Sequence, residues 1–260
     1  MTTDGDEYDL DAGPDPANYA AAAAESATNK TLVYAVGVGP GGPEYLTPRA
    51  EEMLRAADVV VGFETVIDFV RDRTDADLLA CSYRDEATAL TTFADRVADG
   101  ERGVAVLMGD PNHSGYQFVG KVEQAVDEVA GESIGLRVIP GISSIQVAAS
   151  RARTPIEDAT FVTLHKSGNL DDDLRRLRGA VGDRHLLVLP RPFDWTPGDI
   201  AAYLLKHGGE PDDTALVYEH LTHDDECLTR TTLADLASHA GGDTRDETPF
   251  SDLSVLVVRR

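Results

Sequence analysis

Short apolar runs alternate with amphipathic stretches along most of this chain, and the alternation predicts its elements. In the first half, apolar runs predict strands at residues 32–36, 59–61, 78–81, 104–108 and 136–139. Helical spacing between them predicts one helix that begins at Pro48 and others at residues 66–70, 86–98 and 116–129. Continuous apolar strands that alternate with helices are typical of a parallel sheet.

The second half has the same kind of alternation. It begins with a stretch at residues 141–151, in which Ser143 or Ser144 is expected to cap a helix. Apolar runs then predict strands at residues 160–164, 185–189, 215–218 and 254–258, and the last of these is expected to close the sheet. Helices are predicted at residues 171–178, 197–206 and 233–240. We therefore predict an α/β protein with two α/β domains, residues 31–138 and 139–260.

Residues 1–30 differ from the rest of the chain. They carry a cluster of acidic residues, then Gly and Pro, then an alanine run at residues 20–24. Few apolar residues before the alanines could be buried in a core. We expect a disordered acidic tail, with a helical turn or two in the alanine run.

The acidic charge of the chain argues against nucleic-acid or anionic-membrane partners and suggests adaptation to high salt. The chain has 23 Lys and Arg against 46 Asp and Glu, so its formal net charge is −23. Nucleic acids and anionic membranes need basic patches, and neither is expected as a partner. Acids spread over the whole chain indicate a solvated surface adapted to high salt, where screening removes self-repulsion. We expect a lower melting temperature when salt is removed; equal melting temperatures in molar and millimolar salt would contradict this.

Targeting and cysteine signals are sparse. No apolar run approaches a membrane span, and the N-terminus lacks the basic and apolar regions of a signal peptide, so a cytoplasmic protein is expected. Cys81 and Cys227 share no metal or redox motif, and we expect two ordinary thiols.

A glycine-rich segment follows the first predicted strand. Residues 37–42 read G-V-G-P-G-G, which matches the G-x-G-x-x-G pattern of dinucleotide-binding folds, and Glu64 lies roughly where a ribose-binding acid would be. However, a dinucleotide loop runs directly into a helix. A helix begun at Gly41 would contain Pro48, at a cost of about 3 kcal/mol. Thr47 and Pro48 therefore predict a later helix start, and a plain strand-to-helix turn remains an alternative.

Five segments in a fixed order resemble the tetrapyrrole methylase family, the class III S-adenosylmethionine-dependent methyltransferases. Members carry a V-G-x-G-P-G-x-x-x-x-L-T loop, an A-D-V-V strand, a G-D-P loop and a V-x-P-G-I-S-S turn. The matching segments are residues 36–47, 57–62, 109–111 and 138–144, with an apolar run before a proline at 186–190 as the fifth. The resemblance covers residues 31–258 and implies two α/β domains with a cofactor cleft between them, a homodimer, and S-adenosylmethionine as cofactor.

Within the family, the chain resembles the branch that methylates C5 of precorrin-7 or cobalt-precorrin-7 in cobalamin biosynthesis. The segments that carry this resemblance are residues 140–149, 163–165 and 219–226. Three residues depart from the pattern: Met108 before Gly-Asp-Pro, Lys166 after Leu-His, and His220 where Asn is common. The chain is too short to hold the C15 methylation and decarboxylation unit as well, so a separate partner enzyme is expected for that step.

The resemblance assigns a set of residues to the cofactor pocket. Methyl transfer from a sulfonium needs alignment and exclusion of water more than acid–base chemistry, so no catalytic triad is expected. Asp110 could instead cap its own loop, and Ser143 and Ser144 could be plain helix caps. The assigned residues are Gly39, Pro40, Met108, Gly109, Asp110, His113, Ser143, Ser144 and Pro190.

Other residues are candidates on the substrate side. His165 ends an apolar strand and is either a half-buried histidine or a cleft group that binds a carboxylate or assists proton removal. Arg84, Lys166 and Arg191 are candidate clamps for substrate carboxylates, with plain surface charges as the alternative. The histidines and acids of residues 220–225 superficially resemble a metal cluster but are expected to form a loop, and no metal is predicted.

Three alternatives to C5 methylation stay open. One is methylation of another tetrapyrrole position, namely C11, C17, C20 or uroporphyrinogen. The second is a dinucleotide-binding oxidoreductase, and the third is a binding protein without catalysis. Binding of S-adenosylhomocysteine separates methyltransferases from the oxidoreductase, and turnover separates them from the binding protein.

Overall fold

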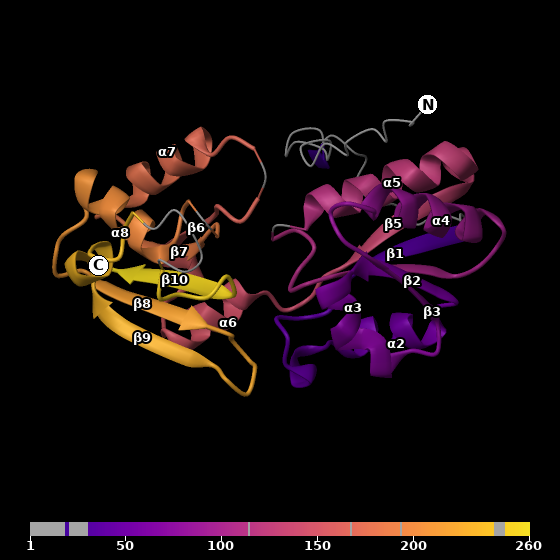
Figure 1. The fold of residues 1–260 in the computed structure, drawn as a ribbon, viewed down its shortest axis with the longest axis horizontal. Helices are drawn as coiled ribbons and strands as arrows, with labels where there is room; N and C mark the ends of the chain where they lie inside the picture. Colours follow the sequence, from indigo (N-terminus) through magenta and orange to yellow (C-terminus); the bar gives the residue numbers. More distant parts are fainter. Residues whose placement is uncertain (1–18, 21–30, 114, 167, 193, 242–247) are drawn as a thin grey trace, which may run out of the picture. The chain divides into compact units, whose positions relative to one another are not determined.

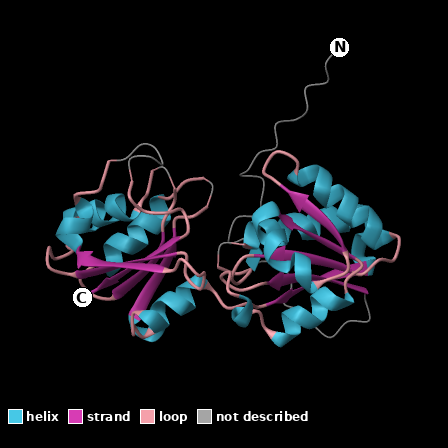
Figure 2. Cartoon of the chain, turned by 60° about the horizontal axis from the view of Figure 1, so that its bottom comes forward, coloured by secondary structure: helices cyan, strands magenta, loops and turns pink. Residues whose placement is uncertain are grey.

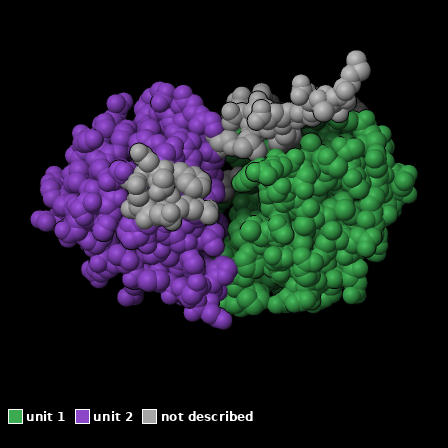
Figure 3. All heavy atoms as spheres, in the orientation of Figure 1, with its two compact units in different colours: residues 1–142 green, residues 143–260 purple. Residues whose placement is uncertain are grey.

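The chain folds into two compact units, residues 1–142 and residues 143–260 (Figure 3). The computed structural model describes residues 19–20, 31–113, 115–166, 168–192, 194–241 and 248–260. The predicted disordered tail lies outside the described residues except for Tyr19 and Ala20, which are helical. The predicted domain boundary, between residues 138 and 139, lies four residues before the division between the units.

Unit 1 is built on a five-stranded parallel sheet with strand order β3-β2-β4-β1-β5 (Figure 1). Its central strands are apolar on both faces, and every residue of β4 is buried. Strands of this kind need a helical layer on each side. The strands are β1 (Thr31–Gly37), β2 (Val59–Phe63), β3 (Asp77–Cys81), β4 (Gly103–Leu107) and β5 (Ile134–Ile139).

Helices cover both faces of this sheet (Figures 1 and 2). One core cluster includes Phe93 and Val97 of α4 with Val122 of α5, and another includes Leu54 of α2 with Ile67 of α3. The five strands and four helices predicted for the first half are confirmed, apart from shifts of a few residues at their ends. The helices are α2 (Pro48–Ala56), α3 (Glu64–Val70), α4 (Glu86–Ala98) and α5 (Tyr116–Ala130), with 3-10 turns η2 (Pro43–Tyr45), η3 (Arg71–Arg73) and η4 (Gly131–Ser133).

Unit 2 contains a mixed five-stranded sheet with strand order β6-β7-β10-β8-β9. β6 and β7 are parallel, whereas β10 runs antiparallel to both β7 and β8. The last strand was expected to close the sheet, but it lies inside it, and β9 was not predicted at all. The strands are β6 (Ala159–Thr163), β7 (His185–Leu189), β8 (Thr214–Glu219), β9 (Cys227–Thr232) and β10 (Ser254–Arg259).

The helices of unit 2 pack on this sheet in two groups. Leu177 of α7, Leu204 of α8 and Leu236 of α9 share one core cluster with apolar residues of the strands. α6 packs separately against β7 and β10. The elements are α6 (Ser144–Arg151), α7 (Asp171–Ala180), α8 (Pro197–Lys206) and α9 (Leu233–Ala237), with the 3-10 turn η5 (Ile156–Asp158).

Candidate functional site

The glycine-rich loop after β1 contacts the loop after β4 through backbone atoms. Gly109 N donates to Gly39 O at 2.7 Å, and Gly39 N donates to Gly109 O at 3.3 Å. Both glycines have positive φ angles, +84° for Gly39 and +66° for Gly109, a conformation that side chains with a Cβ rarely adopt. These two predicted cofactor residues are therefore brought together at the carboxyl edge of the sheet.

The turn after β5 joins the same cluster. A Cβ placed on Gly141 would lie 2.1 Å from Gly109 O, and a Cβ on Gly37 would lie 2.5 Å from the same oxygen. Neither position can hold a side chain without moving backbone. The ends of β1, β4 and β5 thus meet in a cradle lined by peptide groups, which we call the glycine cradle (Gly37, Gly39, Gly109 and Gly141).

Asp110 holds the glycine cradle together. Its Oδ1 accepts a hydrogen bond from Asn112 N at 2.8 Å, and its Oδ2 accepts one from Gly141 N at 3.1 Å. The side chain therefore caps its own loop and also ties that loop to the turn after β5. The capping role considered from the sequence is present, and it fixes the shape of the cradle.

Three other predicted cofactor residues of unit 1 lie on these loops. Pro40 is buried, whereas Met108 and His113 are half-buried. Met108 packs against the core cluster of α2 and α3, and His113 N donates to Asp110 O at 3.0 Å. Their positions follow from their neighbours, since Pro40 follows Gly39 and Met108 precedes Gly109.

The segment between the glycine-rich loop and α2 excludes a dinucleotide-type loop. The 3-10 turn η2 intervenes, and α2 begins only at Pro48. Thr47 caps this helix by accepting a hydrogen bond from Ala50 N at 3.2 Å. The helix start predicted from Thr47 and Pro48 is confirmed, so no α-helix begins directly after the glycines.

In unit 2, Ser143 and Ser144 form the start of α6. Ser143 is 2% exposed, and its Oγ accepts a hydrogen bond from Ile145 N at 3.1 Å. Ser143 N in turn donates to Gln146 Oε1 at 2.8 Å, which completes a capping box. The predicted helix cap is confirmed at Ser143, while Ser144 is the first residue of the helix.

His165 and Pro190 follow the parallel strands β6 and β7. The two residues are linked by a 3.2 Å hydrogen bond between His165 Nδ1 and Pro190 O. Because a carbonyl oxygen only accepts, Nδ1 must carry the proton and Nε2 keeps a lone pair. His165 is exposed rather than half-buried, yet desolvation by the surrounding protein lowers its pKa, and the bond to Pro190 opposes this shift only partly.

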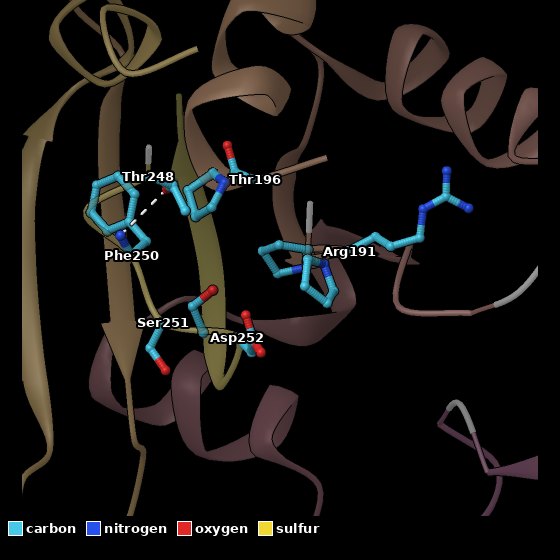
Figure 4. Close-up of a pocket in the computed structure, with 10 residues that line it drawn as sticks. Arg191, Thr196, Thr248, Phe250, Ser251 and Asp252 are labelled. Carbon is cyan, nitrogen blue, oxygen red and sulfur yellow. Dashed lines mark hydrogen bonds between the residues drawn. The ribbon is translucent and has the colours of Figure 1, made fainter. Parts of the chain in front are cut away.

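A small pocket lies beside Pro190 in unit 2 (Figure 4). Ser254, the first residue of β10, is 5% exposed, and its hydroxyl has no hydrogen-bond partner among the described residues. A buried hydroxyl without a partner costs about 1–3 kcal/mol, which a bound ligand could recover. The pocket is lined by Pro190, Arg191, Pro192, Thr196, Pro197, Thr248, Phe250, Ser251, Asp252 and Ser254.

The three candidate carboxylate clamps differ in their surroundings. Lys166 Nζ lies 2.6 Å from Asp173 Oδ2, and both side chains are largely buried. The Arg191 side chain extends away from the pocket residues (Figure 4) and pairs with Asp194. Arg84 is exposed and forms no ion pair with any described residue. Lys166 and Arg191 are thus already neutralised, and Arg84 is not.

Residues 220–226 form a loop after β8, as predicted. His220 Nδ1 lies 2.5 Å from Asp225 Oδ2, and its Nε2 lies 2.8 Å from Ser251 Oγ. Within the described part of the chain, no group of three or more His, Cys, Asp or Glu side chains could hold a metal ion. No helix among the described residues is long and apolar enough to span a bilayer.

Sequence reasoning missed the pocket residues of β10 and of the segment before it. From the sequence, Ser254 was interpreted only as part of an apolar run. The one signal of a functional role is that a serine lies among valines and leucines. Tyr83 was also missed as a candidate binding residue. An aromatic residue in a polar turn between a strand and a helix is a signal that could have indicated it. The significance of both residues depends on neighbours that are distant in the sequence.

Comparison with known proteins identifies the family. The family model of tetrapyrrole (corrin/porphyrin) methylases matches residues 32–237. A probable cobalt-precorrin-7 C(5)-methyltransferase of Methanocaldococcus jannaschii is 27% identical over 208 residues, 80% of this chain and 92% of that protein. A uroporphyrinogen-III C-methyltransferase of Synechococcus elongatus is also 27% identical, over 80% of this chain and 87% of that protein.

A solved structure shares the fold. The uroporphyrin-III C-methyltransferase of Thermus thermophilus, complexed with S-adenosylhomocysteine, superposes with a TM-score of 0.66 at 20% identity, over 88% of this chain and 92% of that chain. The match of the family model to most of the chain agrees with the resemblance found in its motifs. The chain therefore belongs to the tetrapyrrole methylases, a family of S-adenosylmethionine-dependent C-methyltransferases.

Proposed function

We propose that the protein methylates C5 of precorrin-7 or cobalt-precorrin-7, with S-adenosylmethionine as methyl donor. The similarity to the archaeal C5 enzyme supports this ring position, together with the Leu-His segment at residues 164–165 and the P-G-I-S-S turn at residues 140–144. The equal identity to a uroporphyrinogen methyltransferase keeps that substrate as the second candidate.

The glycine cradle is the observation that carries the proposal for the cofactor. Gly37 and Gly141 let the backbone of three strand-end loops pack closely, because a Cβ at either position would collide with Gly109 O. Backbone N–H donors and C=O acceptors suit the polar amino-acid and ribose parts of S-adenosylmethionine. The residues present therefore fit this cofactor.

Each predicted cofactor residue has a role in this proposal. When bound, S-adenosylmethionine supplies a methyl group activated by its positively charged sulfur. Gly39, Pro40 and Gly109 would hold it, while Asp110 keeps their loops in place by bonding Gly141 N. The remaining contacts would come from Met108, His113, Ser143, Ser144 and Pro190. The Ser254 hydroxyl, in the pocket beside Pro190, would donate a hydrogen bond to the cofactor.

His165 has the features of a proton acceptor. Carboxylate binding would require an imidazolium, and the lowered pKa of His165 disfavours that form near neutral pH. Since Nδ1 donates to Pro190 O, Nε2 is left to receive the proton that a ring carbon loses after methylation. We therefore assign proton removal, rather than carboxylate binding, to His165.

The first experiment is a calorimetric titration of S-adenosylhomocysteine into the purified protein in molar salt. We expect micromolar binding near one site per chain, on the order of −8 kcal/mol. A folded protein that does not bind this ligand would contradict the cofactor assignment and favour a binding protein of another class.

The second experiment addresses the ring position. The protein is incubated with S-adenosylmethionine and, separately, with precorrin-7, cobalt-precorrin-7 and uroporphyrinogen III, and products are analysed by mass spectrometry and NMR. One methyl added at C5 of either precorrin supports the proposal, whereas methylation of uroporphyrinogen alone would replace it with the second candidate.

The proposal includes an assembly as well. By analogy with the family, the protein is a homodimer, and a separate enzyme carries out C15 methylation and decarboxylation. Light scattering of the protein in molar salt tests the dimer, and a co-purification with the C15 enzyme tests whether the two associate.

A further inference from the structure

An exposed aromatic ring stands on the turn that follows β3. The Tyr83 side chain is 60% exposed, and its ring centroid lies 4.8 Å from that of Phe63 at the end of β2. Phe63 in turn lies 5.3 Å from Phe118 of α5, which is 6% exposed and belongs to the core. Tyr83 is therefore the outermost ring of a cluster of three tilted aromatic rings anchored in the core of unit 1, and much of its surface is open to solvent.

The turn that carries this ring is held in one conformation. Asp85 Oδ1 accepts hydrogen bonds from Ser82 N at 2.6 Å and from Ser82 Oγ at 2.7 Å. The next residue, Glu86, is 1% exposed and forms an ion pair with Lys121 of α5 at 3.2 Å. The backbone of Tyr83 and Arg84 is fixed before any ligand arrives, which lowers the entropy lost on binding.

The turn lies at the same edge of the sheet as the glycine cradle. All strands of this sheet are parallel, so the segments after β3, β2, β4, β1 and β5 emerge at one edge. β3 and β4 are separated by β2 alone, which puts their ends two strand spacings apart, about 10 Å. A tetrapyrrole with its side chains can span that distance.

Arg84 adds a free positive charge beside the ring. In a chain with twice as many acidic as basic residues, arginines near carboxylates are expected to be paired, as Arg191 is. Arg84 is exposed and forms no ion pair with the described residues. A guanidinium binds carboxylates in a bidentate manner, and the neighbouring aromatic face accepts a flat conjugated ring.

We propose that Tyr83 and Arg84 form a substrate platform, in which the Tyr83 ring stacks on the macrocycle and Arg84 binds one of its peripheral carboxylates. This inference rests on the proposed function, because it takes a tetrapyrrole as the substrate. It identifies one of the three candidate clamps as the residue that binds a carboxylate, and adds an aromatic residue that no motif indicated.

Binding of uroporphyrin III tests the platform. This stable, flat porphyrin carries carboxylate chains on its rim, and its fluorescence reports its binding to the intact protein in the presence of S-adenosylhomocysteine. We expect Tyr83→Ala and Arg84→Gln each to weaken its binding about tenfold, and Tyr83→Phe to bind like the wild type. Arg178→Gln is the matched control, since Arg178 is an exposed arginine of α7 in unit 2.

Titration of S-adenosylhomocysteine into each variant separates the possible failures. We expect unchanged affinity for this ligand in every variant, which also shows that each one folds. A wild type that binds neither ligand contradicts the proposed function. A wild type that binds S-adenosylhomocysteine but not uroporphyrin overturns the platform, and so do Tyr83→Ala and Arg84→Gln variants that bind uroporphyrin as tightly as the wild type.

Discussion

The two units present loops beyond their parallel strands, but the loops are built differently. In unit 1, Gly37 and Gly141 crowd around Gly109 O so closely that no Cβ fits. In unit 2, the pocket beside Pro190 is formed by side chains and includes the hydroxyl of Ser254, which has no hydrogen-bond partner among the described residues. A site made of backbone is sensitive to any added atom, whereas a site made of side chains can be adjusted one group at a time.

The units also differ in the charges at their candidate substrate residues. Lys166 and Arg191 of unit 2 are paired with Asp173 and Asp194. Arg84 of unit 1 is exposed and has no such partner among the described residues. In a protein with a net charge of −23, a carboxylate-rich substrate needs such a site, because most of the surface repels it.

The largest expected effect is on the free energy of unfolding, and it comes from breaking the buried lysine–carboxylate pair of each unit. Glu86 and Lys121 are 1% and 10% exposed, against 7% and 17% for Asp173 and Lys166. Breaking a buried pair costs about 3–5 kcal/mol, because a charge stays buried without its counterion. We expect Glu86→Gln to lower the free energy of unfolding by this amount and Asp173→Asn to lower it by less.

Urea denaturation of both variants in molar salt measures these losses. The more exposed Lys166 can turn toward water after Asp173 is changed, which limits the cost. Equal losses in the two variants would show that burial of the pair does not decide its contribution.

A single methyl group in the glycine cradle should have the next largest effect. In Gly141→Ala, the new Cβ would meet Gly109 O at 2.1 Å, so the loops after β4 and β5 must separate. Overpacking of this kind costs about 1–3 kcal/mol, and we expect affinity for S-adenosylhomocysteine to fall tenfold or more. Calorimetric titration measures the loss.

Gly179→Ala in α7 is the matched control for this change. A Cβ at Gly179 has no heavy atom within 4 Å, and alanine favours a helix by about 1 kcal/mol over glycine. This variant should be as stable as the wild type or more so, with unchanged affinity. If Gly141→Ala also bound normally, the cradle would not be the cofactor site.

The contrast between the units also shows what could be predicted from the sequence. In unit 1, the elements depend on local signals, such as continuous apolar strands and the Thr47–Pro48 start of α2. In unit 2, β9 is an exposed edge strand, with Leu228 49% exposed, and is defined by its pairing with β8. Its three threonines favour a strand, but the sequence carries no apolar alternation, and the apolar pattern therefore did not indicate one.

The order of the strands in the sheet of unit 2 could not be predicted from local sequence patterns either. The apolar run of β10 predicts a buried strand, and the strand is buried, but its insertion between β7 and β8 depends on long-range pairing. The glycines and Asp110 could be found because their backbone roles demand those residue types. Tyr83 and Ser254 are ordinary residue types whose surroundings, set by tertiary structure, make them candidates.

The Ser254 hydroxyl, which has no hydrogen-bond partner within the described part of the chain, predicts opposite effects on stability and on ligand binding. Removing this hydroxyl in Ser254→Ala should stabilise the ligand-free protein by about 1 kcal/mol, because the variant no longer bears the cost of burying a polar group without a partner. The same change should weaken S-adenosylhomocysteine binding about fivefold, since one hydrogen bond to the ligand disappears. Thermal melts and calorimetric titrations measure the two effects.

Thr163→Val provides the control. The Thr163 hydroxyl is also buried without a partner among the described residues, but Thr163 does not line the pocket. This variant should gain stability while keeping its affinity. If Ser254→Ala behaved in the same way as Thr163→Val, Ser254 would have no part in the cofactor site.

The smallest effect concerns the protonation of His165. Its pKa is lowered by the surrounding protein, so the folded state binds fewer protons than the unfolded chain below about pH 6.5. Stability should therefore fall as the pH drops through that value, and His165→Gln should reduce this fall. NMR titration of the imidazole protons, assigned by comparison with the variant, measures the pKa directly. A pKa at or above the ordinary histidine value would leave His165 charged in mildly acid solution and would favour carboxylate binding over proton removal. Unit 2 would then supply a positive charge for the substrate in addition to that of Arg84.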